Sequence, residues 1–560
     1  MEKRLLLAFV LSAVILLGWS VLFPPPPRQT SPVAPQAETG AEVATTEDSA
    51  QTLPTEPVDE GLSTGDYGEE KEDEEATAAI FGSAEGKYRL TNALIEVELT
   101  NRGAAVSSYR LLAYDGDEGQ SLELVQVVPL SERTLPLQLI TADGPDQALY
   151  EVESREDEVV FLWADGRGNS VRKRVALSDS GYGLDIEITT TGERSLNAVS
   201  VGTGMRDLDA TERDSRLALW GEGVMLADGE MERLKRKKVN ETRVLAPGSL
   251  SYVGFEDAYF FNLLRPEGAV SEVRVEPLEF YENGSEEKST RVLRISVVPV
   301  RGQLQGQLLG APKEYDLLQA IDQGVEKTLD FGIFSPISLF FLKALRWIYS
   351  VVGNYGVAII LLTLGIRILL FPLMHTSTVS MRKMQKVQPR VKEIQARHKK
   401  KKSDPQARAK MNQEMMALYK EEGVNPTAGC LPMSVQLPLL WALYQLFLRA
   451  IELRHAPFVF WITDLSAKDP YYVTPILMTA TMWLQQRLAP QAGDPQQQKI
   501  MRMMPLIFGI MFLQFPSGLV LYWLANNVIT IIQQEVTLHL VGERRLKFFG
   551  FGKQRKDAKR

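Results

Sequence analysis

Residues 354–372, NYGVAIILLTLGIRILLFP, form an apolar segment that carries an arginine inside it. A helix of about twenty residues crosses a hydrocarbon layer roughly 30 Å thick. Because Arg367 inside such a helix costs on the order of 2.5–3.5 kcal/mol, we expect it to face a protein interior or a water-filled cavity. Thr363 lies four residues earlier and shares its helical face. The alternative is that Arg367 extends to the nearby cytoplasmic surface, since Pro372 and His375 indicate the helix end.

Acidic residues are concentrated in one segment of the chain. Residues 24–80 hold fourteen Asp and Glu against only Arg28 and Lys71, a net charge of -12 in a chain whose total is -8, so the remainder carries +4. This composition cannot bury enough apolar surface to fold, and we predict a disordered acidic linker over 24–80. The single cysteine, Cys430, excludes an intrachain disulfide and a cysteine-based metal cluster.

Residues 1–23 predict an N-terminal transmembrane anchor. Two basic residues, Lys3 and Arg4, precede an apolar run that continues to Phe23. A cleaved signal peptide is the alternative, but the run is long for one and no small-residue cleavage site follows it. An uncleaved anchor with a cytoplasmic N-terminus therefore implies that the following segment is exported.

Residues 81–330 predict a large exported β-sandwich domain. Short runs between 87 and 300 alternate apolar and polar residues, which indicates half-buried antiparallel strands. That stretch has no His or Cys, which argues against metal and Cys/His catalysis. Glu256 and Asp257 could form a glycosidase-like pair, although solvated loop carboxylates are far commoner. The clearest strand runs are 94–99, 159–163, 184–189, 273–280 and 292–298.

Two helices are predicted before the Arg367 segment. Residues 314–327 resemble a short helix, and Ser335-Pro336 is a helix start with Ser335 as the N-cap. The helix that follows, 337–349, is too short and too charged to span a membrane. We therefore expect 331–352 to be an amphipathic helix in the membrane interface, with a packed linker helix as the alternative.

Residues 375–429 form a basic segment with thirteen Lys and Arg against five acids, which places it in the cytoplasm. Helix signals predict a hairpin of two helices, one over 389–402 and the other over 405–423, with Ser403 or Asp404 as the cap of the second. The charge could serve only to set topology, or it could contact nucleic acid such as ribosomal RNA, anionic lipid or a partner protein. The candidate contact residues are Lys392, Arg397, Lys399, Lys400 and Arg408.

Three further apolar regions complete a predicted α-helical core of five spans over 353–540. Residues 431–448 and 471–488 each predict one span. The region 501–532 is too long for one crossing and is interrupted at 515–518, FPSG, which predicts two spans.

Loop charge agrees with a total of six crossings. The loop 452–469 contains only Arg454 and Lys468 as basic residues and should be external. The tail 541–560 is rich in Lys and Arg and should be cytoplasmic.

Polar residues recur every four positions along the last predicted span, at Tyr522, Asn526, Thr530 and Gln534. Ordinary interhelical hydrogen bonding would explain this pattern. Together with Thr363, Arg367 and Gln436, it also suggests a partly hydrated groove that opens toward the cytoplasm. No Asp or Glu lies in the predicted spans to serve as a proton relay or sodium site.

Several long motifs are similar to those of the YidC/Oxa/Alb family of membrane-protein insertases. They lie at 414–432, 456–478, 495–501 and 515–523, and the resemblance covers about 354–535. The order of anchor, exported β-domain and five-span core resembles the Gram-negative form of the family. This implies a β-supersandwich like those of carbohydrate-binding proteins and a hydrophilic groove open to lipid.

The resemblance makes Arg367 the groove arginine and aligns other positions with the groove. The sequence departs from the family pattern at Gln514, where many relatives have an aromatic residue, and Trp523 stands where a tyrosine is common. The predicted substrate groove comprises Arg367, Thr363, Gln436, Tyr522, Trp523 and Asn526.

We therefore expect an insertase and folding chaperone of the inner membrane, acting alone or with the Sec translocon, with both termini in the cytoplasm. Its expected partners are nascent membrane-protein clients, the Sec translocon, the ribosome and the bilayer, with no small-molecule substrate, cofactor, metal or catalytic residue. A transporter should instead show midplane acids or internal repeats, and an intramembrane enzyme needs a catalytic constellation that the spans lack. A sugar-processing β-domain stays open as a further possibility.

Overall fold

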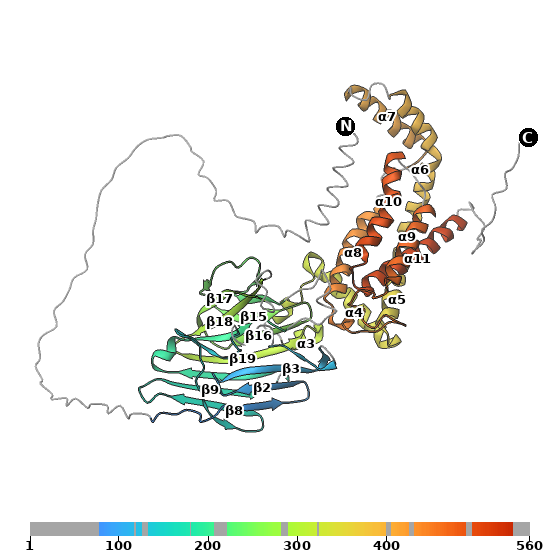
Figure 1. Ribbon diagram of the computed structural model, residues 1–560. Helices are drawn as coiled ribbons and strands as arrows, with labels where there is room; N and C mark the ends of the chain where they lie inside the picture. The colour runs from blue at the N-terminus through green and yellow to red at the C-terminus, as the bar shows by residue number, and fades with distance from the viewer. Residues whose placement is uncertain are drawn as a thin grey trace, which may run out of the picture. The chain divides into compact units, whose positions relative to one another are not determined.

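The computed structural model describes residues 78–540 except for nine short gaps, and it shows a β-domain followed by a helical core (Figure 1). The predicted anchor, nearly all of the acidic linker, the basic tail, Lys399 and Lys400 lie outside the described residues. The gaps are 117–118, 126–132, 180, 207–220, 282–288, 322–323, 399–404, 425–430 and 489–494.

The β-domain consists of antiparallel sheets, three of them among the described residues. The first has the order β1-β2-β3-β4, with β1 Lys87–Thr91, β2 Ile95–Thr100, β3 Ala105–Asp115 and β4 Ser121–Glu123. The largest has the order β13-β12-β15-β16-β19-β10-β9-β8-β7, with β7 Glu151–Ser154, β8 Glu158–Ala164, β9 Ser170–Leu177, β10 Gly183–Thr190, β12 Glu222–Ala227, β13 Glu230–Leu234, β15 Leu250–Glu256, β16 Phe260–Pro266 and β19 Gln303–Pro312. The third has the order β14-β17-β18-β11-β5-β6, with β5 Leu139–Thr141, β6 Gly144–Pro145, β11 Ala198–Thr203, β14 Arg243–Leu245, β17 Val270–Tyr281 and β18 Ser289–Pro299.

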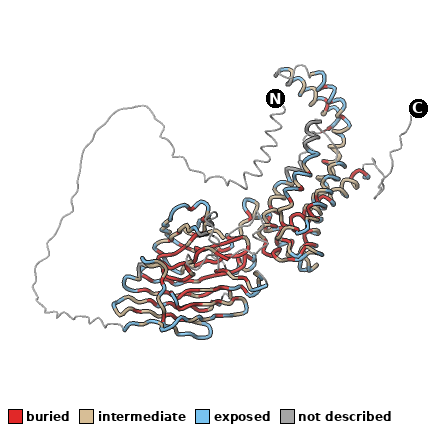
Figure 2. Tube along the Cα trace, in the orientation of Figure 1, coloured by how far each residue is buried: buried red, intermediate tan, exposed pale blue. Residues whose placement is uncertain are grey.

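Alternating side chains build the core of this domain. Along β10, the apolar Leu184, Ile186 and Ile188 are buried while Asp185 and Glu187 between them are partly exposed. A strand places successive side chains on opposite faces, so this pattern buries one face of the sheet. Buried residues follow the strands in Figure 2. Four of the five predicted strand runs lie entirely within an observed strand, and the fifth, 94–99, begins one residue before β2.

The prediction of one helix over 314–327 is wrong. Helix α3 covers only Tyr315–Ile321, and a separate 3-10 turn, η4, covers Val325–Thr328. Gly324 between them has φ +84°, a left-handed conformation that glycine adopts without steric cost and that interrupts a helix.

Helix α4, Ser335–Val352, is longer than expected and begins differently. Phe334 occupies the N-cap position, while the Ser335 hydroxyl donates to the Gly332 carbonyl and accepts from the Phe331 N–H. Together with the preceding turn η5, Gly332–Phe334, this segment is long and apolar enough to cross a membrane by length and composition. The length argument against a span is therefore wrong, although Lys343 and Arg346 still interrupt the apolar run.

Helices α5, Tyr355–Leu369, and α6, Phe371–Arg397, meet at a bend of 62°. Pro372 lies in the first turn of α6, where its ring and missing N–H disrupt the helical path from α5. Arg367 therefore lies in the last turn of α5 and not near the middle of a straight span.

Helix α6 continues through Pro389, so the prediction that the hairpin's first helix begins there is wrong. Proline removes one hydrogen bond inside a helix. Pro389 is exposed, which allows water to satisfy the carbonyl that loses its partner. The second hairpin helix, α7, covers Pro405–Glu421, and Gly423 with φ +61° follows it as expected.

The remaining helices of the core are α8, Leu431–Arg449, α9, Val473–Leu488, α10, Pro495–Phe512, and α11, Ser517–Leu540, with the turn η8, Ile451–Leu453, after α8. Helix α10 ends at Phe512 and α11 begins at Ser517. This confirms a break between two helices, but it falls at 513–516, and Ser517 and Gly518 already belong to α11. In the part of the chain that the structure describes, only Gly332–Val352 and the bent pair α5 and α6 meet the length and composition criteria for a span. The five-span count therefore stays a prediction.

The start of α5 is held by a loop that lies about a hundred positions later. Asn354 caps α5 by accepting from the Val357 N–H, and its amide donates to the Phe458 carbonyl at 3.0 Å. The Phe458 ring fills the space beside Gly356, where an added Cβ would lie 2.0 Å from a ring carbon. This glycine is required by close packing and not by its backbone conformation.

Candidate functional site: a buried cation in the helical core

Arg367 is buried, with only 6% of its surface exposed. It projects from the last turn of α5 toward α11, where its Nε donates to the Asn526 Oδ1 at 2.7 Å and one terminal nitrogen donates to the same oxygen. Helices α5 and α11 pack along each other, which fixes this pair. The structure thus joins two residues that the sequence placed in one groove.

A second amide from α11 reaches the same end of α5. The Gln533 Nε2 donates to the Arg367 carbonyl at 2.9 Å. The spacing-four pattern selected Gln534 and missed Gln533. Seven residues make nearly two helical turns, so a search at i+7 from Asn526 would have found Gln533 on the same face.

The other predicted groove residues lie in different surroundings. The Thr363 hydroxyl donates to the Ile359 carbonyl of its own helix at 2.7 Å. The Gln436 Nε2 donates to the Tyr522 hydroxyl at 3.4 Å, which links α8 to α11. Trp523 packs in an aromatic cluster with Phe508 and Phe512 of α10, whose ring centroids lie 6.3 and 4.9 Å away. No polar contact joins Thr363 or Trp523 to Arg367 in the described part of the chain.

The charge of Arg367 has no ionic partner among the described residues. A guanidinium stays protonated in proteins, and a buried charge usually has an opposite charge beside it. Here a neutral amide oxygen takes that place. In addition, the buried Oε1 atoms of Gln533 and Gln534 have no hydrogen-bond partner within the described ranges. The site therefore offers polar groups for binding.

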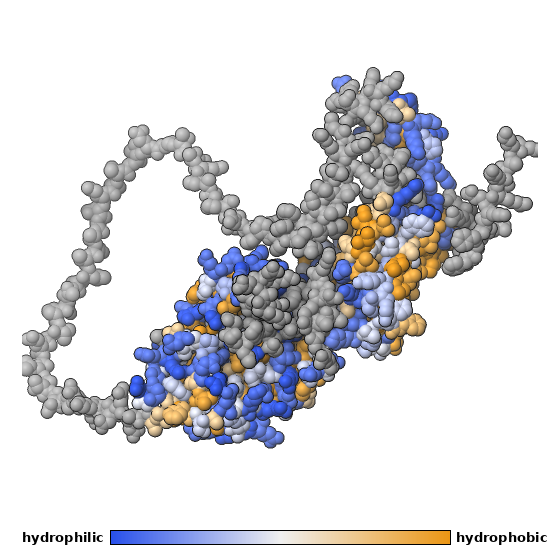
Figure 3. Space-filling model, viewed as in Figure 1, coloured by the Kyte–Doolittle hydropathy of each residue, from blue (hydrophilic) through white to orange (hydrophobic). Residues whose placement is uncertain are grey.

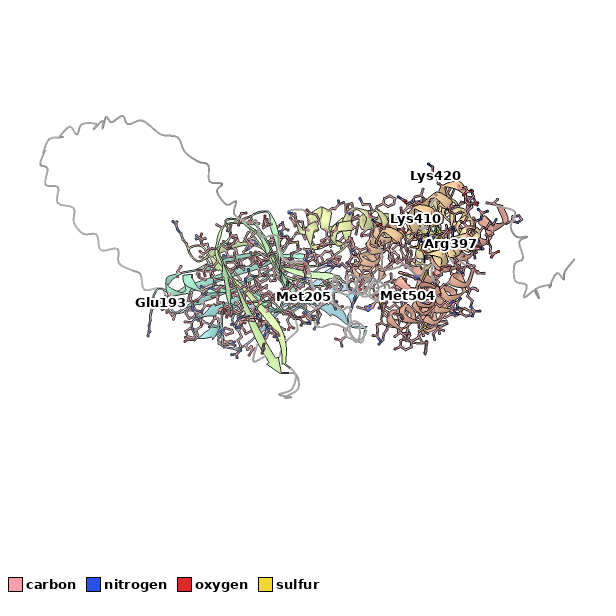
Figure 4. The ribbon with its side chains drawn as sticks, turned by 90° about the horizontal axis from the view of Figure 1, so that it is seen from above. Glu193, Met205, Arg397, Lys410, Lys420 and Met504 are labelled. Carbon is pink, nitrogen blue, oxygen red and sulfur yellow. The ribbon has the colours of Figure 1, made fainter. Side chains whose placement is uncertain are left out.

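The basic hairpin of α6 and α7 packs through a small apolar cluster and exposes its charges. Lys392 and Arg397 are exposed on α6, and Arg397 lies 3.9 Å from Glu414 of α7. Figure 4 labels Arg397 with Lys410 and Lys420 on this part of the molecule. Arg408 lies on α7, but its side chain is outside the described set. The apolar cluster comprises Val387, Val391, Ile394, Leu418 and Val424.

Glu256 and Asp257 of the β-domain are neither solvated nor free. Both are buried, the Glu256 Oε2 lies 2.7 Å from the Lys313 Nζ, and the Asp257 Oδ2 lies 2.6 Å from the Arg206 Nε. Burial raises the pKa of Glu256, but the charges of Lys313 and Arg233 and their hydrogen bonds outweigh it and hold the pKa below the ordinary value. These carboxylates stabilise the domain through ion pairs, which disfavours the glycosidase interpretation.

Hydropathy separates the two ends of the helical core. Apolar side chains gather on the visible surface of the helices, while the hairpin end is polar (Figure 3). Exposed apolar residues are numerous on α5, α9 and α10, as expected for helices that face lipid. Examples are Leu361, Leu364, Ile368, Ile476, Leu477, Leu506, Ile507 and Ile510.

A β-domain joined to a helical core with an apolar surface and a buried cation is typical of an integral membrane protein of two parts, and comparison with known proteins agrees. The family model described as "YidC periplasmic domain" matches residues 87–344. The model described as "60Kd inner membrane protein" matches 347–543. The chain is therefore an inner-membrane protein with a periplasmic domain.

Curated relatives identify the family. The membrane protein insertase YidC of Geobacter metallireducens is 34% identical over 550 residues, which cover 95% of this chain and 98% of the relative. That of Syntrophus aciditrophicus is 36% identical over 558 residues, covering 95% and 99%. The chain belongs to the YidC family of membrane protein insertases. A crystal structure of an active YidC insertase with its first transmembrane domain resolved matches 82% of this chain and 94% of its own, with 19% identity and a TM-score of 0.34.

Proposed function

We propose that the chain inserts nascent membrane proteins by receiving the polar part of a client segment at Arg367 while the apolar part moves into lipid. The observation that carries this proposal is the buried guanidinium, which bonds a neutral amide and no carboxylate in the described part of the chain. A positive charge with spare hydrogen-bonding capacity suits transient contact with acidic or polar client residues. The groove consists of Arg367, Thr363, Gln436, Tyr522, Trp523 and Asn526.

The energy for insertion comes from the client's own apolar residues. Burial of apolar surface releases roughly 25 cal/mol per Å², whereas every unsatisfied backbone group in hydrocarbon costs several kcal/mol. Polar groups placed partway across the membrane shorten the distance over which client polar residues lack partners. The site thus lowers the barrier without a nucleotide, cofactor or metal.

Capture of the client precedes this step. The exposed basic residues of α6 and α7, with Lys399, Lys400 and Arg408 beside them in the sequence, are suited to the ribosome or to the nascent chain. In this proposal the protein acts alone or with the Sec translocon, assists folding of its clients, and crosses the membrane six times with both termini in the cytoplasm. The anchor is 1–23, the linker 24–80, the interfacial helix 331–352 and the insertase core 353–540.

Sealed liposomes containing the purified full chain test the proposal. A short client with one or two spans is translated outside them, and protease-protected fragments are compared for empty liposomes, the unsubstituted chain and Arg367→Ala. Arg487→Ala is the matched control, because Arg487 is an exposed arginine that stacks on Trp483 at 3.6 Å.

We expect protection with the unsubstituted chain and with Arg487→Ala, and a loss with Arg367→Ala. Equal protection with Arg367→Ala would show that insertion does not require the positive charge of Arg367. Protection no greater than that of empty liposomes would contradict independent insertion by the chain.

A further inference from the structure

An open cavity of about 480 Å³ lies where α4 ends and α5 begins. Both helices contribute to it, and the rings of Tyr349 and Tyr355 stack within it at a centroid distance of 3.8 Å and an angle of 6°. The cavity therefore has a rigid aromatic wall. The lining residues are Lys343, Arg346, Trp347, Tyr349, Ser350 and Tyr355.

This lining contains two cations and no acidic residue. Arg346 is bound to Asp316 at 2.6 Å and lies 3.8 Å from Glu452, but neither carboxylate lines the cavity. The Lys343 Nζ lies 4.7 Å from the centroid of the Tyr315 ring and has no ion pair in the described ranges. The charge of Lys343 also acts on the Asp316 carboxylate, but Lys343 is held in no ion pair in the described ranges and remains a cation of the cavity lining.

Hydrogen-bond donors accompany this charge. Tyr349 and Tyr355 line the cavity, and their hydroxyls have no hydrogen bond within the residues that the structure describes. The Ser350 hydroxyl is occupied, because it donates to the Trp347 carbonyl at 2.7 Å. An ammonium and two free hydroxyls match an anion that has several acceptor oxygens.

Helix α4 carries an exposed apolar stripe beside the cavity. Phe340, Trp347 and Val351 are 66%, 70% and 73% exposed, and they recur at helical spacing on one face. The opposite face buries Phe341 and Leu345 in the core. A soluble surface rarely shows such large apolar side chains in a row, whereas a helix in contact with lipid requires them.

The two family matches meet inside α4, beside this cavity, and we take this boundary as the level of the membrane surface. The periplasmic match ends at residue 344 and the inner-membrane match begins at 347, so the transition falls inside α4 and between two lining residues, Lys343 and Trp347. Trp and Tyr side chains concentrate at this depth, where their rings meet both water and lipid. The occupant nearest to the cavity is then a lipid headgroup.

We propose that this cavity binds the phosphate of an anionic phospholipid in the outer leaflet of the inner membrane. Lys343 supplies the opposite charge, the Tyr349 and Tyr355 hydroxyls donate to phosphate oxygens, and Trp347 contacts the upper part of the acyl chains. Arg346, held by Asp316, forms the base of the site. The site is independent of Arg367 and of the client groove.

Quenching of Trp347 fluorescence tests this proposal in the full chain reconstituted into phosphatidylcholine vesicles. A small fraction of the lipid carries a spin label near the top of its acyl chain. The labelled lipid is phosphatidylglycerol in one set of vesicles and phosphatidylcholine in the comparison set. The chain has eight tryptophans, so the Trp347 signal is the difference between the unsubstituted chain and Trp347→Phe.

We expect labelled phosphatidylglycerol to quench Trp347 with about fivefold higher apparent affinity than labelled phosphatidylcholine, as one additional basic contact at a membrane surface provides. Lys343→Gln should abolish this preference, Lys343→Arg should keep it, and Tyr349→Phe with Tyr355→Phe should reduce it. Lys383→Gln is the matched control, because Lys383 is exposed on α6 and outside the cavity.

Equal quenching by the two lipids in the unsubstituted chain would overturn the proposal, as would an unchanged preference in Lys343→Gln. Excess inorganic phosphate distinguishes the two sources of the anion. If it abolishes the preference, the site binds free phosphate and the lipid proposal fails. Circular dichroism and thermal unfolding of each variant verify that the fold is kept, and Lys343→Arg keeps the test valid if Lys343→Gln does not fold.

Discussion

Two buried cations of the β-domain, Lys313 and Arg206, and the buried Arg367 of the helical core have different partners. In the β-domain, Lys313 and Arg206 each contact a buried carboxylate at 2.7 and 2.6 Å. In the core, Arg367 contacts the amide of Asn526. A carboxylate neutralises the charge and holds the cation in one place, whereas an amide leaves the positive charge available to a further partner.

This difference separates stability from function. Buried ion pairs fix the packing of a domain because neither partner can be exposed without loss. A buried cation without an opposite charge destabilises the protein while no client is bound. Binding of an acidic or polar client group then lowers the free energy. The core accepts this cost at Arg367, and the β-domain accepts it at one position, Lys173, whose buried ammonium donates to three backbone carbonyls.

The largest effect is expected when the β-domain loses one of its carboxylates. Glu256→Gln leaves Lys313 buried without its ionic partner, and the free energy of unfolding should fall by about 3–5 kcal/mol. Denaturant unfolding of the full chain in detergent, followed by circular dichroism, measures this. Glu98→Gln is the control, because Glu98 pairs with the exposed Lys87 and should cost less than about 1 kcal/mol.

Removal of the amide in the core should have a smaller effect that a second substitution reverses. Asn526→Leu leaves Arg367 without the acceptor it contacts and should destabilise by about 1–3 kcal/mol. Adding Arg367→Met removes the orphaned charge, so the double variant should be more stable than Asn526→Leu alone. A thermal unfolding cycle of the four chains measures the coupling, and simple additivity would contradict the contact.

Acid should distinguish the two regions as well. The pKa of Glu256 is lowered in the folded chain, so the stability it contributes is present above its unfolded value of 4.5 and is lost as the pH falls through the folded pKa. The free energy of unfolding of the unsubstituted chain should therefore fall as the pH is lowered below 4.5. The Glu256→Gln variant should lose less over the same range, because it has no carboxylate at this position to protonate. The Arg367 to Asn526 contact has no group that titrates in this range.

The smallest effect is expected at Thr363. Its hydroxyl bonds a carbonyl of its own helix, so Thr363→Val should change the free energy of unfolding by no more than about 1 kcal/mol. Protease protection of a client in liposomes should fall much less than with Arg367→Ala, because the Thr363 hydroxyl is occupied within its own helix. A loss as large as that of Arg367→Ala would show that the hydroxyl contacts the client directly.

The sequence predicted the β-domain and a break between the last two helices, and it placed Arg367 and Asn526 in one groove, because alternation, turn residues and helical spacing are local signals. It did not predict that α6 passes through Pro389, since a solvent-exposed proline can be tolerated where a buried one cannot. Gln533 was missed because only one spacing was searched. The ion pairs of Glu256 join residues far apart in sequence, and no local pattern reports which strands meet.

The contact between Asn354 and the Phe458 carbonyl spans 104 positions of the chain. During synthesis at about 5–20 residues per second, roughly 5–20 s separate the appearance of its two ends. For that interval the beginning of α5 lacks the loop that finally packs on it. A protein that inserts other chains into the membrane thus passes through a stage of its own synthesis in which α5, the helix that carries Arg367, has been made but does not yet have the loop that packs on its first turn.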